Sequence, residues 1–193
     1  LFNRKQGNIH SLSIVSKQTV HNDLSSIDCD PFLSEWRTMK RKSDKEATFR
    51  KASKADTGLL QEMIKDYYVF DKQKIDEATI QSSLTIALEE NPHVIIWIIE
   101  VDRKMAGYLA IVIGFTIEAG GKDGFIDELF LKSPYRGLGF GRQAVDFAIE
   151  ICPSLGIRRL SLEVEPHNKR AKRLYEDVGF FTHDRILMSH WID

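Results

Sequence analysis

The sequence predicts an α/β (α+β) domain built on a mixed, mostly antiparallel central sheet of about seven strands, flanked by about four helices. Two observations lead to this prediction. Segments with strand and helix periodicity follow one another in the order β, α, α, β, β, β, α, β, α, β, β from residue 46 onward. In addition, a strand pattern at 125–131 runs through a glycine-rich turn into a helix pattern, which is typical of a crossover connection.

The first elements are recognised by their ends. A short strand at 48–52 is followed by Ser53 and Asp56, which resemble a capping box, and by an apolar stripe from Leu59 to Tyr67 that predicts a helix. A second helix is expected after Asp76, which can act as its N-cap, and Asn91-Pro92 stops it. The pattern then predicts a meander of three strands, at 94–101, 106–115 and 125–131.

The last elements return to alternation between strands and helices. Apolar residues from Ala144 to Ile151 predict a helix, and strict alternation at 159–164 predicts a strand with one buried face. A further helix is expected to end at Gly179, a typical C-cap. Two short strands are predicted after it, at 180–183 and 186–191. Residues 1–45 show little sustained periodicity, so we expect an N-terminal extension at 1–45 and one domain at 46–193.

Composition excludes several classes of function. A formal charge of −1 gives no electrostatic case for binding nucleic acid or an anionic membrane. The chain contains no apolar run of the roughly 18 residues that a transmembrane helix needs. Two cysteines, Cys29 and Cys152, do not form a disulfide framework, so we expect a cytoplasmic protein. The histidines show no metal-ligand spacing, and no metal is expected.

The stretch from Arg136 to Gly141 has the properties of an anion site. A strand, a glycine-rich turn and a helix start together present unpaired N–H groups and the positive end of a helix dipole. No Lys-Ser or Lys-Thr follows the glycines as in a Walker A loop, and their spacing differs from the GxGxxG of dinucleotide-binding folds. The alternative is an ordinary strand–helix connection whose glycines serve only the turn.

Two motifs carry a resemblance to a known family. The pattern Arg-x-x-Gly-x-Gly, at Arg136, Gly139 and Gly141, resembles the pyrophosphate-binding motif of the GNAT superfamily of acetyl-CoA-dependent N-acetyltransferases. About 30 residues later, a second motif resembles the helix that follows the family's fifth strand, in the residues Asn168, Ala171, Leu174, Tyr175 and Gly179-Phe180. The resemblance covers about residues 46–193. The family often has proline at the position of Ser133, which shifts the turn slightly.

The resemblance implies acetyl-CoA as co-substrate and a set of residues that bind it. Main-chain groups of Phe130 and Leu131 would bond the pantetheine arm, and Asn168 would contact that arm or order the loop. The pyrophosphate would lie on Arg136, Gly137, Leu138, Gly139, Phe140, Gly141 and Arg142. The charge run at 169–173 is interpreted as a solvated face, from which one cation reaches the 3′-phosphate.

The resemblance also implies catalytic roles. An alkylammonium with a pKa near 10.4 must lose a proton before it attacks the thioester, and Glu128 is the expected base, directly or through a water. Because side chains alternate along a strand, Asp127 and Glu128 are expected on opposite faces, so that only one serves the cleft. Tyr175 is the expected proton donor to the leaving thiolate. The alternatives are a surface ion pair for Glu128 and an ordinary amphipathic face for Tyr175.

The acceptor is only coarsely predicted. Four acidic residues lie in or near the predicted strand at 125–131: Glu118, Asp123, Asp127 and Glu128. Their negative charge favours a small cationic amine as acceptor, such as a metabolite or an antibiotic-like amine. Tyr67, Tyr68 and Phe70 are candidate walls of its pocket. A protein or peptide acceptor, through lysine or an N-terminus, stays open, as does a non-catalytic acyl-CoA-binding module. The oligomeric state stays open between a monomer and a homodimer.

Overall fold

The described part of the chain forms a five-stranded sheet between two pairs of helices. The computed structural model describes residues 45–71, 76–89 and 91–192, so the predicted extension at 1–45 lies outside it except for Lys45. The strands follow one another across the sheet in chain order. They are β1 (Ala47–Lys51), β2 (Val94–Val101), β3 (Lys104–Thr116), β4 (Gly121–Leu131) and β5 (Ile157–Leu162). The first four are antiparallel, and β5 runs parallel to β4.

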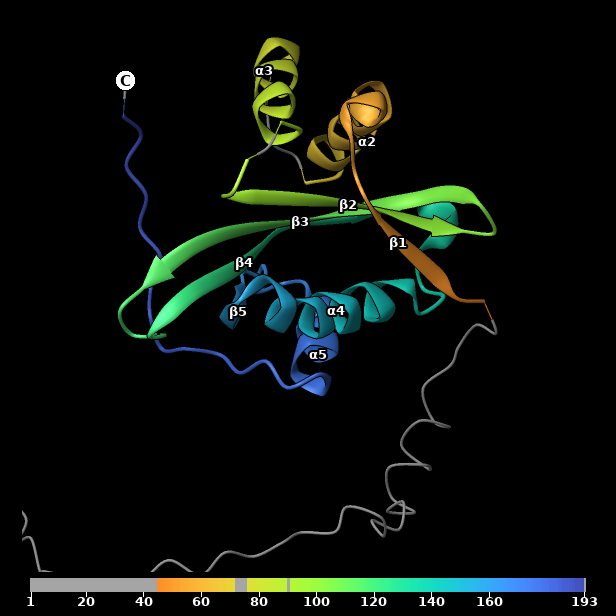
Figure 1. Ribbon diagram of the computed structural model, residues 1–193. Helices are drawn as coiled ribbons and strands as arrows, with labels where there is room; N and C mark the ends of the chain where they lie inside the picture. The colour runs from red at the N-terminus through yellow and green to blue at the C-terminus, as the bar shows by residue number, and fades with distance from the viewer. Residues whose placement is uncertain (1–44, 72–75, 90, 193) are drawn as a thin grey trace, which may run out of the picture. The chain divides into compact units, whose positions relative to one another are not determined.

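Helices cover both faces of this sheet (Figure 1). α2 (Thr57–Phe70) and α3 (Glu77–Ala87) lie on one face, and α4 (Phe140–Ile151) and α5 (Lys169–Asp177) lie on the other. The parallel pairing of β4 with β5 follows from α4, because parallel strands need a crossover between them. The expected mixed α/β fold is confirmed.

The two faces of the sheet carry separate apolar cores. Along β3, Leu109 and Ile111 join the core under α4, whereas Tyr108 and Ala110 join the core under α2 and α3. This division follows from the pleat, which sends successive side chains to opposite faces. All four side chains are at most 5% exposed, so β3 is the central strand of both cores. Cys152 is buried in the core under α4.

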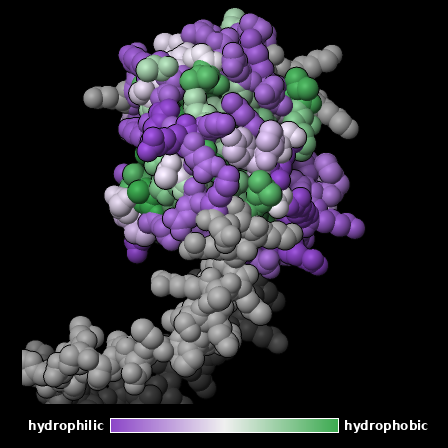
Figure 2. All heavy atoms as spheres, turned by 90° about the vertical axis from the view of Figure 1, so that its right-hand side faces the viewer, coloured by the Kyte–Doolittle hydropathy of each residue, from purple (hydrophilic) through white to green (hydrophobic). Residues whose placement is uncertain are grey.

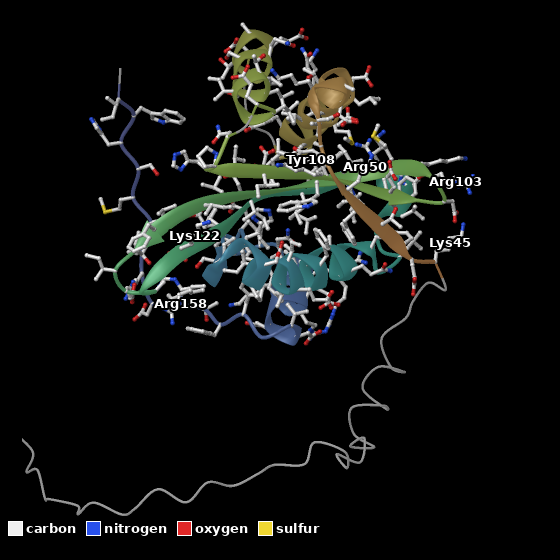
Figure 3. The ribbon with its side chains drawn as sticks, viewed as in Figure 1. Lys45, Arg50, Arg103, Tyr108, Lys122 and Arg158 are labelled. Atoms are coloured by element: carbon white, nitrogen blue, oxygen red, sulfur yellow. The ribbon has the colours of Figure 1, made fainter. Side chains whose placement is uncertain are left out.

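The hairpin between β2 and β3 explains the antiparallel start of the sheet. Asp102 and Arg103, in the predicted turn, both adopt positive φ, of 51° and 62°. Two consecutive residues of this kind twist in the same sense as the strands they join. The end of the hairpin is visible at Arg103 in Figure 3.

A bulge interrupts the pairing of β3 with β4. Ala110 lies opposite Glu128, but its neighbour Ile111 lies opposite Ile126. Asp127 therefore has no partner on β3. One extra residue in a strand stops the regular alternation of its side chains at that point.

The strands expected at 180–183 and 186–191 do not form, so the described chain has five strands and not seven. Beyond α5 the residues up to 192 carry no strand, and Ile186 and Trp191 are each 90% exposed. Their alternating apolar pattern has the composition of a strand, but a strand also needs a pairing partner, which composition does not supply. β5 consequently forms an edge of the sheet.

The surface visible in Figure 2 is mainly polar, and its hydrophobic side chains form small separate patches. No helix within the described ranges combines the length and the apolar character that crossing a bilayer requires.

An ion pair between Arg50 and a buried carboxylate, Asp56, fixes the start of α2. Both guanidinium nitrogens Nη1 and Nη2 of Arg50 donate to Asp56, at 2.9 and 2.7 Å, and the main-chain N–H of Ser53 donates to Asp56 Oδ2 at 2.8 Å. The predicted capping box of Ser53 and Asp56 is thereby confirmed. Asp56 is only 5% exposed. The bonds from Arg50 hold the pKa of Asp56 well below its usual range.

We expect Asp56→Ala to lower the free energy of unfolding by about 2–3 kcal/mol, because the Ser53 N–H loses its partner and Arg50 keeps only its bond to Glu100. The lowered pKa makes the contribution of Asp56 complete above its unfolded-state pKa of about 3.9, and lost as the pH falls below that value. Below about pH 4, urea unfolding should therefore show a steeper loss of stability in the wild type than in the variant.

Glu89→Ala is the matched control, because Glu89 pairs with Lys54 in an exposed ion pair. Its effect should stay within about 0.5 kcal/mol. An Asp56→Ala protein as stable as this control would contradict the role of the Arg50–Asp56 pair.

Candidate active site

The glycine turn between β4 and α4 is shaped by two residues with left-handed backbone. Gly137 has a φ of 81°, and Gly139, the N-cap of α4, has a φ of 97°. A side chain at either φ is strained, although a Cβ at Gly139 would meet no atom within 4 Å. Phe140 follows and is 1% exposed, with its ring 6.2 Å from that of Tyr135. The buried Phe140 thus anchors the start of α4, whose first N–H groups lack partners within the helix.

Arg136 lies toward β4 and α2 in this structure. Its Nε donates to the main-chain oxygen of Leu131 at 2.6 Å. Its guanidinium carbon lies 4.2 Å from the ring centroid of Phe70 and 5.3 Å from that of Phe130. The sequence suggested Arg136 as the cation at the rim of the anion site.

The cation beside the glycine turn is Arg170, from the first turn of α5. A Cβ on Gly137 would lie 3.2 Å from its Nη2 atom. In the sequence, Arg170 belongs to the charge run at 169–173, which was interpreted as a solvated helix face. Its position next to the turn depends on how α5 packs beside α4, which the order of residues does not reveal.

Two further residues of the predicted CoA site lie at the N-cap of α5 and in the first turn of α4. The Asn168 side-chain oxygen accepts from the N–H of Ala171 at 3.2 Å, so Asn168 caps α5. Arg142, in α4, donates from Nη2 to the main-chain oxygen of Asp177 at 3.5 Å and lies 3.5 Å from Asp146. The first contact fixes the start of α5, and the bond from Arg142 connects α4 with the end of α5. Leu138 is 43% exposed at the turn, and Gly141 approaches Leu131 and Leu174.

The bulge in β4 brings two carboxylates to the same groove. Asp127 and Glu128 both line a groove of about 420 Å³ between the sheet, α2 and α3. The expectation that they point to opposite faces was therefore wrong, because the extra residue breaks the alternation on which it rested. A bulge leaves no distinct signal in a single sequence.

Glu128 is held by tyrosine hydroxyls. The hydroxyl of Tyr108 donates to Glu128 Oε2 at 2.9 Å, and Tyr68 also bonds the carboxyl group. Figure 3 shows Tyr108 on the central strand. Burial raises the pKa of Glu128, while the two hydroxyls oppose this shift. The hydrogen-bond partners of Glu128 among the described residues are thus neutral hydroxyls and not cations. Its raised pKa makes it a better base for a proton from an amine.

Two of the four acidic residues that suggested a cationic acceptor are already paired. Arg159 Nη2 lies 2.6 Å from Asp123, and Arg159 Nη1 lies 3.1 Å from Glu118. The acidic character of the groove therefore rests on Asp127 and Glu128.

Tyr175 is half-buried on α5, with its ring 6.0 Å from that of Phe180. It lines a second cavity, of about 500 Å³, between β5, α5 and the segment after it. Burial raises the pKa of Tyr175, so the hydroxyl keeps its proton at neutral pH and can donate it. Tyr67, whose pKa is raised to about 12 mainly by burial, lies within electrostatic reach of both Glu128 and Tyr175.

We expect Tyr108→Phe to raise the pKa of Glu128 further, because the bond from Tyr108 stabilises the charged carboxylate. The measurement is a ¹³C NMR titration of the Glu128 carboxyl. Tyr135→Phe removes a hydroxyl from the opposite side of the sheet and should leave the titration unchanged. An unchanged or lowered Glu128 pKa in Tyr108→Phe would contradict this account.

Comparison with known proteins agrees with this geometry. The model of the acetyltransferase (GNAT) family matches residues 58–180. An uncharacterized N-acetyltransferase of Bacillus subtilis, YycN, is 36% identical over 99 residues, which are 51% of this chain and 62% of that relative. The match thus spans less than two thirds of that relative's length.

Two other proteins extend the comparison. A Bacillus subtilis protein named as a candidate alanine N-acetyltransferase of ribosomal protein bS18 is 32% identical over 118 residues, which are 61% of this chain and 74% of that protein. A protein of Clostridium acetobutylicum, described as a predicted acetyltransferase and solved with acetyl-CoA, superposes with a TM-score of 0.63 at 19% identity. It covers 75% of this chain and 96% of its own. The chain belongs to the acetyltransferase (GNAT) family.

Proposed function

We propose that this protein is an N-acetyltransferase that moves the acetyl group of acetyl-CoA to a small cationic primary amine by direct attack in a ternary complex. The observation that carries the proposal is the turn with left-handed Gly137 and Gly139 at the start of α4, directly after the strand that bears Glu128. Glu128 and the glycine turn are thus close in sequence, which supports a base and an anion site at the same place.

The residues of the turn fit the diphosphate of CoA. The main-chain N–H groups from 137 to 142 lie at the start of α4, and Arg170 supplies positive charge beside Gly137. The pantetheine arm would follow the main chain of Phe130 and Leu131. Since Arg136 already bonds the Leu131 oxygen, the arm has to share or replace that bond.

The proposed reaction begins with deprotonation of the acceptor amine. Glu128 accepts a proton from the ammonium group, and the neutral nitrogen attacks the carbonyl carbon of the thioester. A main-chain N–H near Phe130 or Leu131 stabilises the oxyanion. The C–S bond breaks and Tyr175 protonates the thiolate. The nitrogen loses a second proton as the amide forms, which restores the Tyr175 hydroxyl through solvent, and Glu128 releases its own proton to solvent. The products are the N-acetyl amine, CoA thiol and one proton.

Glu128→Gln should lower kcat by about 100-fold or more and remove the acidic limb of the pH profile, because the raised pKa of Glu128 sets that limb. Tyr175→Phe should lower kcat by about tenfold or more. Thiol release measures both, and calorimetry should find acetyl-CoA affinity within about twofold of the wild type, since neither side chain is assigned to the diphosphate.

Glu118→Gln, on an exposed side chain, is the control and should keep wild-type kinetics. Two catalytic variants that bind acetyl-CoA and turn over like the wild type would overturn the roles of Glu128 and Tyr175. Binding of acetyl-CoA without turnover of any amine by the wild type would favour the non-catalytic acyl-CoA-binding module.

Gly139→Ala should weaken acetyl-CoA binding by about tenfold, because a Cβ is strained at a φ of 97° and the turn has to shift. Gly58→Ala is the matched control in α2, where the added methyl group meets no atom within 4 Å and φ is not positive. Calorimetry on both proteins checks the prediction. Equal affinities would remove the glycine turn from the binding site.

A protein or peptide acceptor is the second candidate function. It is favoured by the 32% identity to the bS18 alanine N-acetyltransferase candidate. A thiol-release screen with small amines, lysine peptides and peptides with N-terminal alanine separates the two. Preference for small amines supports the first proposal, and preference for peptides supports the second.

A further inference from the structure

The groove beside Glu128 has an apolar wall and an acidic end. α3 and the sheet line most of it with aliphatic side chains, among them Ile80, Leu84 and Ile96. Its charged members are Asp127 and Glu128. None of the described residues that line it is Lys, Arg or His.

Part of this apolar wall is open to solvent. Leu84 is 3% exposed, but Ile86, which also lines the groove, is 61% exposed. A ligand that covers Ile86 therefore gains apolar burial that the protein alone does not supply. The volume of about 420 Å³ is near the lower end of the range for small-molecule sites.

Charge and apolar surface together define the ligand. An ammonium group fits at Asp127 and Glu128, where two carboxylates lie within one groove. Away from the two carboxylates the lining is mainly aliphatic, and its polar members are Tyr68, Ser83 and Asn91. A second cation or a row of hydroxyls would therefore lose water and gain few partners there.

We propose that the acceptor is a primary monoamine with an apolar alkyl or aryl-alkyl chain. The nitrogen of this amine lies at Glu128, and its apolar chain lies along α3, over Ile86. The inference rests on the proposed function and narrows its acceptor from cationic amines in general to amphipathic ones.

A series of unbranched alkylamines tests the apolar wall. From propylamine to hexylamine, kcat/KM should rise about fourfold per methylene, the factor that corresponds to burial of one CH₂ group. The matched pair is hexylamine and 1,6-diaminohexane, which differ in the second ammonium group. We expect the diamine to be slower by about tenfold or more in kcat/KM, since its far end would be a cation against aliphatic groups.

Two pairs of variants test whether the alkyl chain of the acceptor lies in the groove. Ser83→Lys puts a cation into the lining and should raise the KM for hexylamine about tenfold, with the KM for acetyl-CoA unchanged. Gln81→Lys puts the same charge on an exposed position of α3 outside the lining and should stay within about twofold. Ile86→Asn should lower kcat/KM for hexylamine more than for propylamine, whereas Ile117→Asn, at a side chain 93% exposed beyond β3, should affect neither.

The outcomes separate this inference from the proposed function. Efficient turnover of the diamine, an aminoglycoside or a peptide in preference to hexylamine would overturn the inference and leave an N-acetyltransferase. Equal effects of Ser83→Lys and Gln81→Lys would also overturn it. If acetyl-CoA does not bind, or no amine releases thiol, the proposed function fails and the inference falls with it.

Discussion

The unpaired residue in β4 is the constraint on which the candidate site depends. Without it, Asp127 and Glu128 would alternate, and one of them would face the core under α4. With it, both carboxylates line the groove under α2 and α3, and Glu128 reaches the hydroxyl of Tyr108. The strand beyond the bulge resumes its alternation and delivers Leu131 to the glycine turn. One added residue thus places both carboxylates in one groove, on the strand that leads to the glycine turn.

The sequence predicted the elements whose signals are local. The capping residues Ser53 and Asp56, the turn at 102–104 and the N-cap Asp76 all act within a few positions of the helix or strand they define, and the structure confirms them. The glycine turn belongs to this group, because backbone handedness is a property of single residues. The order of strands up to β5 was equally readable from periodicity.

What the sequence did not predict depends on contacts between distant residues. The bond of Tyr108 to Glu128 joins two strands, and the position of Arg170 beside Gly137 joins two helices. Arg136 is a similar case, because its place on the Leu131 oxygen and the Phe70 ring depends on how α2 ends above β4. The two strands predicted at 180–183 and 186–191 did not form for a related reason. Their composition suits a strand, but a strand also needs a pairing partner, which local composition does not supply.

The backbone at Gly139 has a consequence for chemical variation of the turn. Its φ of 97° belongs to the mirror image of the region that ordinary side chains favour, while the space around its missing Cβ is empty. The obstacle to a larger residue is therefore chirality and not room. A D-alanine introduced by peptide ligation fits this conformation without strain, whereas every genetically encoded replacement carries the opposite hand.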